Sequence, residues 1–263
     1  MIEDNQLNAP LLSQRLTLRA YTAFALQAGD DAMLCGKLLV LSGLGRQGIA
    51  CAFGGTLAGA ACLGIDPDPQ TVKQAMREGG CDFMVTTLDE ALRILKTEIR
   101  KRRPVSVGMA GAAAEVMQEL VERGVQPDLL TDFLLPPAAD VPDSSEEDAD
   151  DSAAVQVAAM QKLAARGATL LDMNGRLAGW FSAPVVPTPG QIEVWSKQQG
   201  YELWQRAMGS GEALRAFDAA ALALMPQEDW LRRRWLEQGP KYFRRHLPER
   251  WLWVTAEEKG RLL

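Results

Sequence analysis

A Gly-x-Gly-x-x-Gly motif is the feature that most constrains the fold of this chain. Residues 43–48 read Gly-Leu-Gly-Arg-Gln-Gly. They follow the mainly apolar run 37–42, and their last two residues begin the small-residue stretch 47–60. An apolar run that stops at glycine is typical of a buried parallel strand, and the stretch after the motif predicts a helix. In such a turn the first glycine allows the tight bend, and the second lets the backbone approach a pyrophosphate. The third lets the following helix pack closely on its strand. The proposed dinucleotide contacts in this turn are Gly43, Gly45, Arg46, Gln47 and Gly48.

An acidic residue follows at the spacing that a dinucleotide fold requires. Asp66 lies at the end of a second apolar run, 61–66, and 18 residues after Gly48. A carboxylate at this place hydrogen-bonds a ribose 2′-hydroxyl, which favours NAD over NADP. The alternative is that the glycines serve only turn geometry and packing, and that Asp66 begins an Asp-Pro turn. Both interpretations stay open at the level of sequence.

Strands and helices alternate along the first two thirds of the chain. Further strands are expected at 83–86, 105–109, 129–131 and 168–172, and further helices at 69–77, 89–100, 112–123 and 153–166. Strands separated by helices of this length are typical of βαβ units. The sequence therefore predicts an α/β fold with a doubly wound, parallel, Rossmann-like sheet and a helical C-terminal region.

Changes in composition suggest three parts. We expect an N-terminal helical lead-in at 1–29, with its helix at 12–27, a Rossmann-like dinucleotide-binding domain at 30–182, and a helical C-terminal region at 183–263. Six acids in the run 143–151 predict a solvated, mobile loop. In the tail, arginines alternate with tryptophans in a way that can stack nucleobases. Core tryptophans with solvated arginines, or an arginine contact to the acidic run, are the other interpretations.

Composition excludes several classes of function. The net charge of −6 and the pI near 5.0 argue against a nucleic-acid partner held by phosphate contacts. No apolar run reaches membrane-spanning length, and the first residues lack a basic and apolar leader, so we expect neither membrane insertion nor export, but a cytoplasmic protein. The cysteines, Cys35, Cys51, Cys62 and Cys81, show no metal-ligand spacing and are expected to be reduced core residues. With His246 as the sole histidine, no metal site is predicted.

Polar residues at the ends of the later strands are candidates for a substrate pocket. Asp132, Asp172 and Asn174 follow predicted strands. Open α/β sheets place their ligands at the carboxyl ends of the strands, so these side chains could line a pocket. The alternative is that each aspartate caps the turn or helix that follows it.

Several segments resemble the urocanase family, whose members are NAD-dependent hydratases. Similar to family motifs are Gly36-Lys37 with the strand and glycine turn, Thr56-Leu57-Ala58-Gly59-Ala60, Leu88-Asp89-Glu90-Ala91-Leu92, the segment 106–115, and the segment 119–132. The last, Glu-Leu-Val-Glu-Arg-Gly-Val-Gln-Pro-Asp-Leu-Leu-Thr-Asp, resembles the family most specifically. Fainter similarity extends the match to about position 255. The resemblance implies a Rossmann-like NAD-binding domain.

The same resemblance implies a short, divergent family member. Asp66 corresponds to the family's ribose-binding glutamate. Ala112 replaces an asparagine of the family's nucleotide site, whereas Ala113 is identical to the family's alanine at the next position. Where the family has polar residues that line the cofactor site, this chain has an apolar segment that begins with Phe133 and Leu134. The family's catalytic cysteine lies late in its sequence, and this chain has no cysteine after Cys81 that could correspond to it. We therefore count Ala112 and Ala113 among the cofactor-binding positions and assign no catalytic residue.

Two functions remain as hypotheses. The first is an NAD-binding, hydro-lyase-like enzyme that does not hydrate urocanate on its own. The second is a non-catalytic descendant that acts as an interaction or regulatory protein, in which Arg46, Phe133 or Leu134 occupies the cofactor space. A homo-oligomer or a separate partner subunit is expected under either hypothesis.

Overall fold

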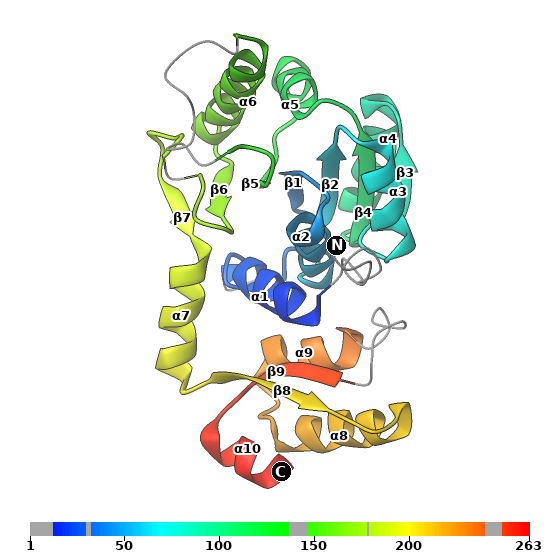
Figure 1. The fold of residues 1–263 in the computed structure, drawn as a ribbon, viewed down its shortest axis with the longest axis vertical. Helices are drawn as coiled ribbons and strands as arrows, with labels where there is room; N and C mark the ends of the chain where they lie inside the picture. The colour runs from blue at the N-terminus through cyan, green and yellow to red at the C-terminus, as the bar shows by residue number, and fades with distance from the viewer. Residues whose placement is uncertain (1–12, 30–32, 137–146, 178, 240–248) are drawn as a thin grey trace, which may run out of the picture.

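A parallel sheet of seven strands forms the centre of the molecule. The computed structural model describes residues 13–29, 33–136, 147–177, 179–239 and 249–263. The strands are β1 (Leu38–Ser42), β2 (Ala61–Asp66), β3 (Phe83–Val85), β4 (Val105–Ala110), β5 (Leu129–Asp132), β6 (Thr169–Asp172) and β7 (Val185–Pro187). Their order in the sheet is β3-β4-β2-β1-β5-β6-β7, and every pairing is parallel (Figure 1). The predicted α/β, doubly wound, Rossmann-like fold is confirmed.

Helices cover both faces of this sheet. They are α1 (Gln14–Ala25), α2 (Arg46–Leu57), α3 (Pro69–Arg77), α4 (Leu88–Arg100), α5 (Ala113–Glu122) and α6 (Glu147–Ala165). In β1, Leu39 and Leu41 join the core with α1, α2 and α3, whereas Leu38 and Val40 join the core with α4, α5 and α6. Burial on both faces explains why this strand is a continuous apolar run in the sequence.

The C-terminal region is more varied than the sequence predicts. It contains α7 (Thr188–Gln199), α8 (Gly211–Leu224), α9 (Trp230–Gln238) and α10 (Ala256–Leu262), but also β8 (Glu202–Ala207) and β9 (Glu249–Val254). These two strands form a separate antiparallel sheet, and β7 joins the main sheet beyond residue 182. The C-terminal region therefore contains the predicted helices together with a two-stranded sheet that the sequence does not predict.

The acidic run also differs from its prediction. Helix α6 begins at Glu147, so its backbone is helical over the second half of the run 143–151, where a loop is predicted. Residues 143–146, like His246, lie outside the described residues.

Helix α1 connects the sheet domain to the C-terminal region. The Tyr21 hydroxyl donates to the Leu231 carbonyl oxygen at 2.9 Å, and the Trp253 indole N–H donates to the Thr22 hydroxyl at 3.0 Å. On its other side α1 packs on α2, where a β-carbon on Gly54 would lie 2.7 Å from the Tyr21 backbone nitrogen. The tail is thus fixed to the helix that packs on α2 (Figure 1).

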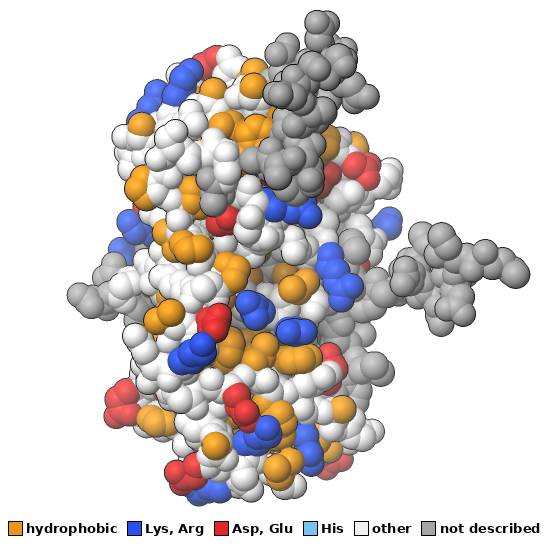
Figure 2. Space-filling model, turned by 60° about the vertical axis from the view of Figure 1, so that its left-hand side comes forward, with side chains coloured by type: hydrophobic (Ala, Val, Ile, Leu, Met, Phe, Trp, Pro, Cys, Tyr) orange, Lys and Arg blue, Asp and Glu red, His pale blue; other side chains and the backbone are white. Residues whose placement is uncertain are grey.

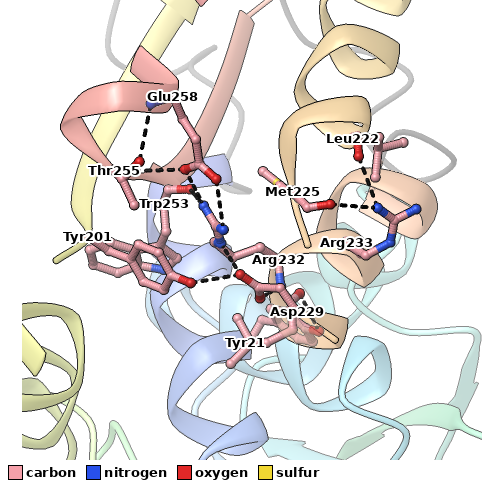
Figure 3. A network of polar contacts seen from close by, with 11 residues as sticks. Tyr21, Tyr201, Leu222, Met225, Asp229, Arg232, Arg233, Trp253, Thr255 and Glu258 are labelled. Atoms are coloured by element: carbon pink, nitrogen blue, oxygen red, sulfur yellow. Dashed lines mark hydrogen bonds and ion pairs between the residues drawn. The ribbon is translucent and has the colours of Figure 1, made fainter. Parts of the chain in front are cut away.

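Buried ion pairs hold the tail together. Arg232, 3% exposed, pairs with Asp229 and with Glu258 in α10, and also donates to the Trp253 carbonyl oxygen (Figure 3). Arg250, 2% exposed, donates to both carboxylate oxygens of Asp218, at 2.8 and 2.7 Å. A buried charge needs such a partner to offset its desolvation.

Within the described parts of the chain, no helix is long and apolar enough to cross a membrane. In the same residues, no group of three or more His, Cys, Asp or Glu side chains could hold a metal ion. The four cysteines are free thiols, with Cys51, Cys62 and Cys81 buried and Cys35 half-buried.

Candidate functional site

The chain changes direction across the sheet at the carboxyl ends of β1 and β5. β2 pairs with one side of β1, and β5 pairs with the other. Open α/β sheets bind ligands in the crevice at such a switch point. The glycine turn, residues 43–48, leaves β1 at this place, and the Phe133 amide donates to the Ser42 carbonyl oxygen at 2.9 Å beside it.

The glycine turn has the geometry that its motif predicts. Gly43 has φ +86°, a conformation that favours glycine, and its amide donates to the Ile65 carbonyl oxygen at 2.7 Å. A β-carbon on Gly48 would lie 1.7 Å from the Gly43 carbonyl oxygen, so only glycine fits there. A β-carbon on Gly45 would meet nothing within 4 Å. The first and third glycines therefore build the turn, and the second leaves its outer side open.

Two helices begin beside β2 without a capping side chain. Gly45 is the N-cap of α2 and Ala112 is the N-cap of α5, and neither position supplies a side-chain acceptor. By contrast, Asp68 and Thr87 cap α3 and α4. Because the first amides of a helix have no acceptor within that helix, an uncapped start attracts an anion. Gly45, Arg46, Gln47 and Ala112 are exposed, whereas Ala113 is buried.

Asp66 lies between these two helix starts, at the end of β2. One carboxylate oxygen accepts from the Leu44 amide at 2.7 Å and the other from the Asp68 amide at 3.0 Å. The residue is 6% exposed. These amides fix the orientation of the carboxylate, and each oxygen has a second lone pair for a further donor. Both interpretations of Asp66, turn former and ribose acceptor, are compatible with this geometry.

Asp132 acts within the protein rather than in an open pocket. It is 1% exposed, and its carboxylate accepts from the Leu134 and Leu135 amides at 2.9 and 2.6 Å. The Ser42 hydroxyl and the Gln156 side-chain amide donate to its other oxygen. Burial raises the pKa of Asp132 to about 6, against the lowering effect of these hydrogen bonds. The capping interpretation matches this arrangement.

Asp172 has a comparable position after β6. One of its oxygens accepts from the Gly175 and Arg176 amides at 2.7 and 3.0 Å, and the other from the Leu177 amide at 3.2 Å. The Asn174 side-chain oxygen accepts from the Arg176 amide at 3.2 Å. The Asn174 side-chain nitrogen is buried and finds no hydrogen-bond partner among the described residues. The strand-end aspartates thus hold their own turns.

A small cavity of about 50 Å³ opens next to the glycine turn, between α1, α2 and α7. Its walls include Gln47 from the turn, and Phe133 and Met173 from the positions directly after Asp132 and Asp172. Arg19 of α1 and Thr188 of α7 complete its polar lining. The face that carries β7 and α7 shows hydrophobic side chains with Lys and Arg among them (Figure 2). No sequence pattern singles out Arg19, because it lies on a helix before the first strand.

Apolar side chains pack against the start of the turn. A β-carbon on Gly43 would lie 3.0 Å from the Phe133 β-carbon and 3.2 Å from the Leu134 side chain. Leu134 is nevertheless 39% exposed. The apolar segment that replaces the expected polar wall therefore lies on the β5 side of the turn, whereas the space in front of Gly45 stays open.

The comparison with known families identifies one matching domain. Residues 17–134 match the family described as the urocanase Rossmann-like domain. The match begins within α1 and ends directly after β5, so it includes the glycine turn, Asp66 and the start of α5.

Proposed function

We propose that the Rossmann-like domain of this chain, in which residues 17–134 match the urocanase Rossmann-like domain, binds NAD at the carboxyl edge of its sheet. The observation that carries the proposal is the glycine turn between β1 and α2. It joins a glycine that no other residue can replace, Gly48, to an open and uncapped helix start at Gly45. This combination provides a cradle for a diphosphate.

The diphosphate would lie over the first turn of α2. The amides of Arg46 and Gln47 come directly after the open position, and both residues are exposed. Within the described residues Arg46 forms no ion pair. Its guanidinium would therefore add a charge-assisted contact to a phosphate oxygen.

The adenosine half would extend across β2 toward β4. Asp66 would accept a hydrogen bond from the ribose, since its carboxylate is held in place by two amides and keeps free lone pairs. The uncapped start of α5, at Ala112 and Ala113, borders the same edge. A carboxylate at the ribose disfavours a 2′-phosphate, so the proposal is specific for NAD over NADP.

The nicotinamide half would lie on the β5 side, near the small cavity. In the urocanase family the nicotinamide ring serves as an electrophile toward the substrate. Here Phe133 and Met173 would give the ring apolar walls, and Arg19 would be the cation nearest to a bound substrate. Asp132 and Asp172 are engaged by their own turns, so we assign them no role in proton transfer.

We propose that this chain does not hydrate urocanate on its own. The cavity beside the glycine turn is small, and no cysteine follows Cys81 in the sequence. A hydro-lyase-like reaction would then depend on a second copy or on a partner subunit that encloses the substrate. A cytoplasmic location remains the expectation from composition.

A second function is favoured by the packing of Phe133 and Leu134 against Gly43. In a non-catalytic interaction or regulatory protein, these side chains would keep the crevice closed, and the Rossmann-like domain would serve as a scaffold. The two functions differ in one measurable property, which is binding of the dinucleotide.

Calorimetric titration of the purified protein with NAD tests the proposal. We expect saturable binding, weaker binding of NADP, and loss of NAD binding in Asp66→Ala and Gly45→Val. Asp68→Asn is the matched control for Asp66, because Asp68 is an exposed cap of α3 at the same edge. Absence of binding at millimolar NAD would reject this function and support the scaffold.

A further inference from the structure

A second cavity lies in the C-terminal region, away from the glycine turn. It is a groove of about 380 Å³ where the end of α1, helix α7 and the segment before α9 meet. Three aromatic side chains line it, from Trp195, Tyr201 and Trp230. This volume lies within the range of sites for small molecules. Neither the proposed NAD site nor the family match includes these aromatic residues.

The aromatic side chains of the groove are arranged at angles to one another. The ring centroids of Trp195 and Tyr201 lie 5.4 Å apart, with 59° between their planes. The Arg232 guanidinium carbon lies 4.1 Å from the centroid of Tyr201, so this ring already attracts one cation. The faces of tryptophan and tyrosine rings carry negative potential and bind cations, including quaternary ammonium groups.

The charged groups that line the groove are negative. They are the carboxylates of Glu228 and Asp229, and among the described residues no lysine or arginine lines it. Glu228 is exposed and forms no ion pair within the described part of the chain. Because Asp229 pairs with Arg232, the negative charge that remains unpaired at the groove, within the described residues, is that of Glu228, and a carboxylate next to aromatic rings favours a cationic ligand.

The hydrogen bonds around Asp229 narrow the kind of cation. One of its oxygens accepts from the Tyr201 hydroxyl at 2.7 Å and from Arg232, and the other accepts from the Arg232 amide at 3.2 Å (Figure 3). Burial and then this Asp229 contact raise the pKa of Tyr201 to about 12, so the phenol keeps the proton that it donates. A cation without hydrogen-bond donors does not have to compete with Tyr201 and Arg232 for Asp229, because the aromatic side chains that line the groove can contact it directly.

We propose that the groove formed by Trp195, Tyr201, Trp230 and Glu228 binds a quaternary ammonium group. The group could belong to a small molecule such as choline or to a trimethylated lysine on a partner protein, because the recognising chemistry is the same. The site does not depend on NAD binding, since its residues lie in the C-terminal region.

Choline and its neutral carbon isostere, dimethylbutanol, provide a direct test with the full-length protein. Calorimetry or saturation-transfer NMR should detect saturable binding of choline, and the isostere, which has the same shape without the charge, should bind at least about tenfold more weakly. A trimethyllysine peptide and its unmethylated form, titrated in parallel, identify the source. Binding of choline alone indicates a small molecule, and selective binding of the methylated peptide indicates a protein partner. Either result supports the site.

Two variants connect the binding to this groove. Glu228→Gln removes an exposed charge without disturbing the core, and it should weaken choline binding about three- to tenfold while leaving the isostere unchanged. Trp195→Leu should abolish binding. Glu212→Gln, an exposed neutralisation in the first turn of α8, is the matched control and should bind as the wild type does. Equal binding of choline and its isostere, no binding of any probe, or full binding by Glu228→Gln would overturn the proposal.

Discussion

A β-carbon on Gly48 would lie 1.7 Å from the carbonyl oxygen of Gly43. This relationship closes the turn between β1 and α2, because the first helical turn packs directly on the residue that ends the strand. It also separates two roles within one motif. Gly48 is required to build the turn, whereas Gly45 has open space in front of it and is required only if a ligand approaches.

Alanine substitutions at these two glycines should therefore have different effects. Gly48→Ala should lower the free energy of unfolding by at least about 2 kcal/mol, because the added carbon overpacks against backbone. Gly45→Ala should cost less than about 1 kcal/mol, since its φ of −65° suits alanine at an N-cap. It should nevertheless weaken NAD binding, because the added methyl group would stand where the diphosphate approaches. Thermal unfolding and NAD titration of both variants measure the two effects, and equal destabilisation by both would contradict the assignment.

Shortening Phe133 distinguishes the two proposed functions. Phe133→Ala should enlarge the space beside Gly43. If Phe133 forms a wall for the nicotinamide, the variant should bind NAD more weakly than the wild type. If instead Phe133 blocks the crevice, the variant should bind NAD where the wild type does not. The matched control is Phe83→Ala, an exposed aromatic residue on the edge strand β3, which should leave NAD binding unchanged.

Asp132 should make stability depend on pH. Its folded-state pKa of about 6 lies above the ordinary value of 3.8, so between these values the folded protein holds a proton that the unfolded chain has released. The contribution of Asp132 to the free energy of unfolding is thus greatest below pH 3.8. It decreases by about 3 kcal/mol as the pH rises from 3.8 to about 6. Asp132→Asn should remove this dependence. Urea unfolding of both proteins across this range tests it, and parallel pH curves would show that the pKa is not raised.

The buried pair between Asp218 and Arg250 should be required for the C-terminal region. Asp218→Asn leaves the guanidinium of Arg250, 2% exposed, without its counter-charge, which typically costs about 3–5 kcal/mol. The exposed pair of Glu193 and Lys197 is the control, since Glu193→Gln should change stability by less than about 1 kcal/mol. Chemical denaturation measures the free energy of unfolding of Asp218→Asn, Glu193→Gln and the wild type. Similar small effects would mean that the Arg250 pair does not stabilise the fold.

The sheet could be predicted from the sequence because its strands are buried on both faces. β1 and β2 are continuous apolar runs, and helices with clear caps such as Asp68 separate the strands. The strands β8 and β9 could not be predicted in the same way. Polar residues occupy buried positions there, as Arg250 does through its pair with Asp218, so the usual alternation of apolar and polar residues is absent.

The candidate site could be predicted only in part. The spacing of the motif places the glycine turn and Asp66 at one edge, since both follow directly from the order of strand, turn and helix. The sequence leaves open whether the Asp132 and Asp172 side chains face a pocket or cap their own turns, because their direction depends on the amides of the turns that follow them. Arg19 could not be predicted either, because only tertiary packing of α1 on α2 brings it to the cavity.

The most direct test of NAD binding follows the backbone amides of the glycine turn. Two-dimensional NMR of the isotope-labelled protein during NAD titration should shift the amide signals of Gly45, Arg46 and Gln47 in a saturable way. The amide of Ser210, at the start of α8, should stay unchanged. Unchanged signals at all three turn amides with millimolar NAD, or shifts confined to other parts of the protein, would contradict NAD binding at this turn.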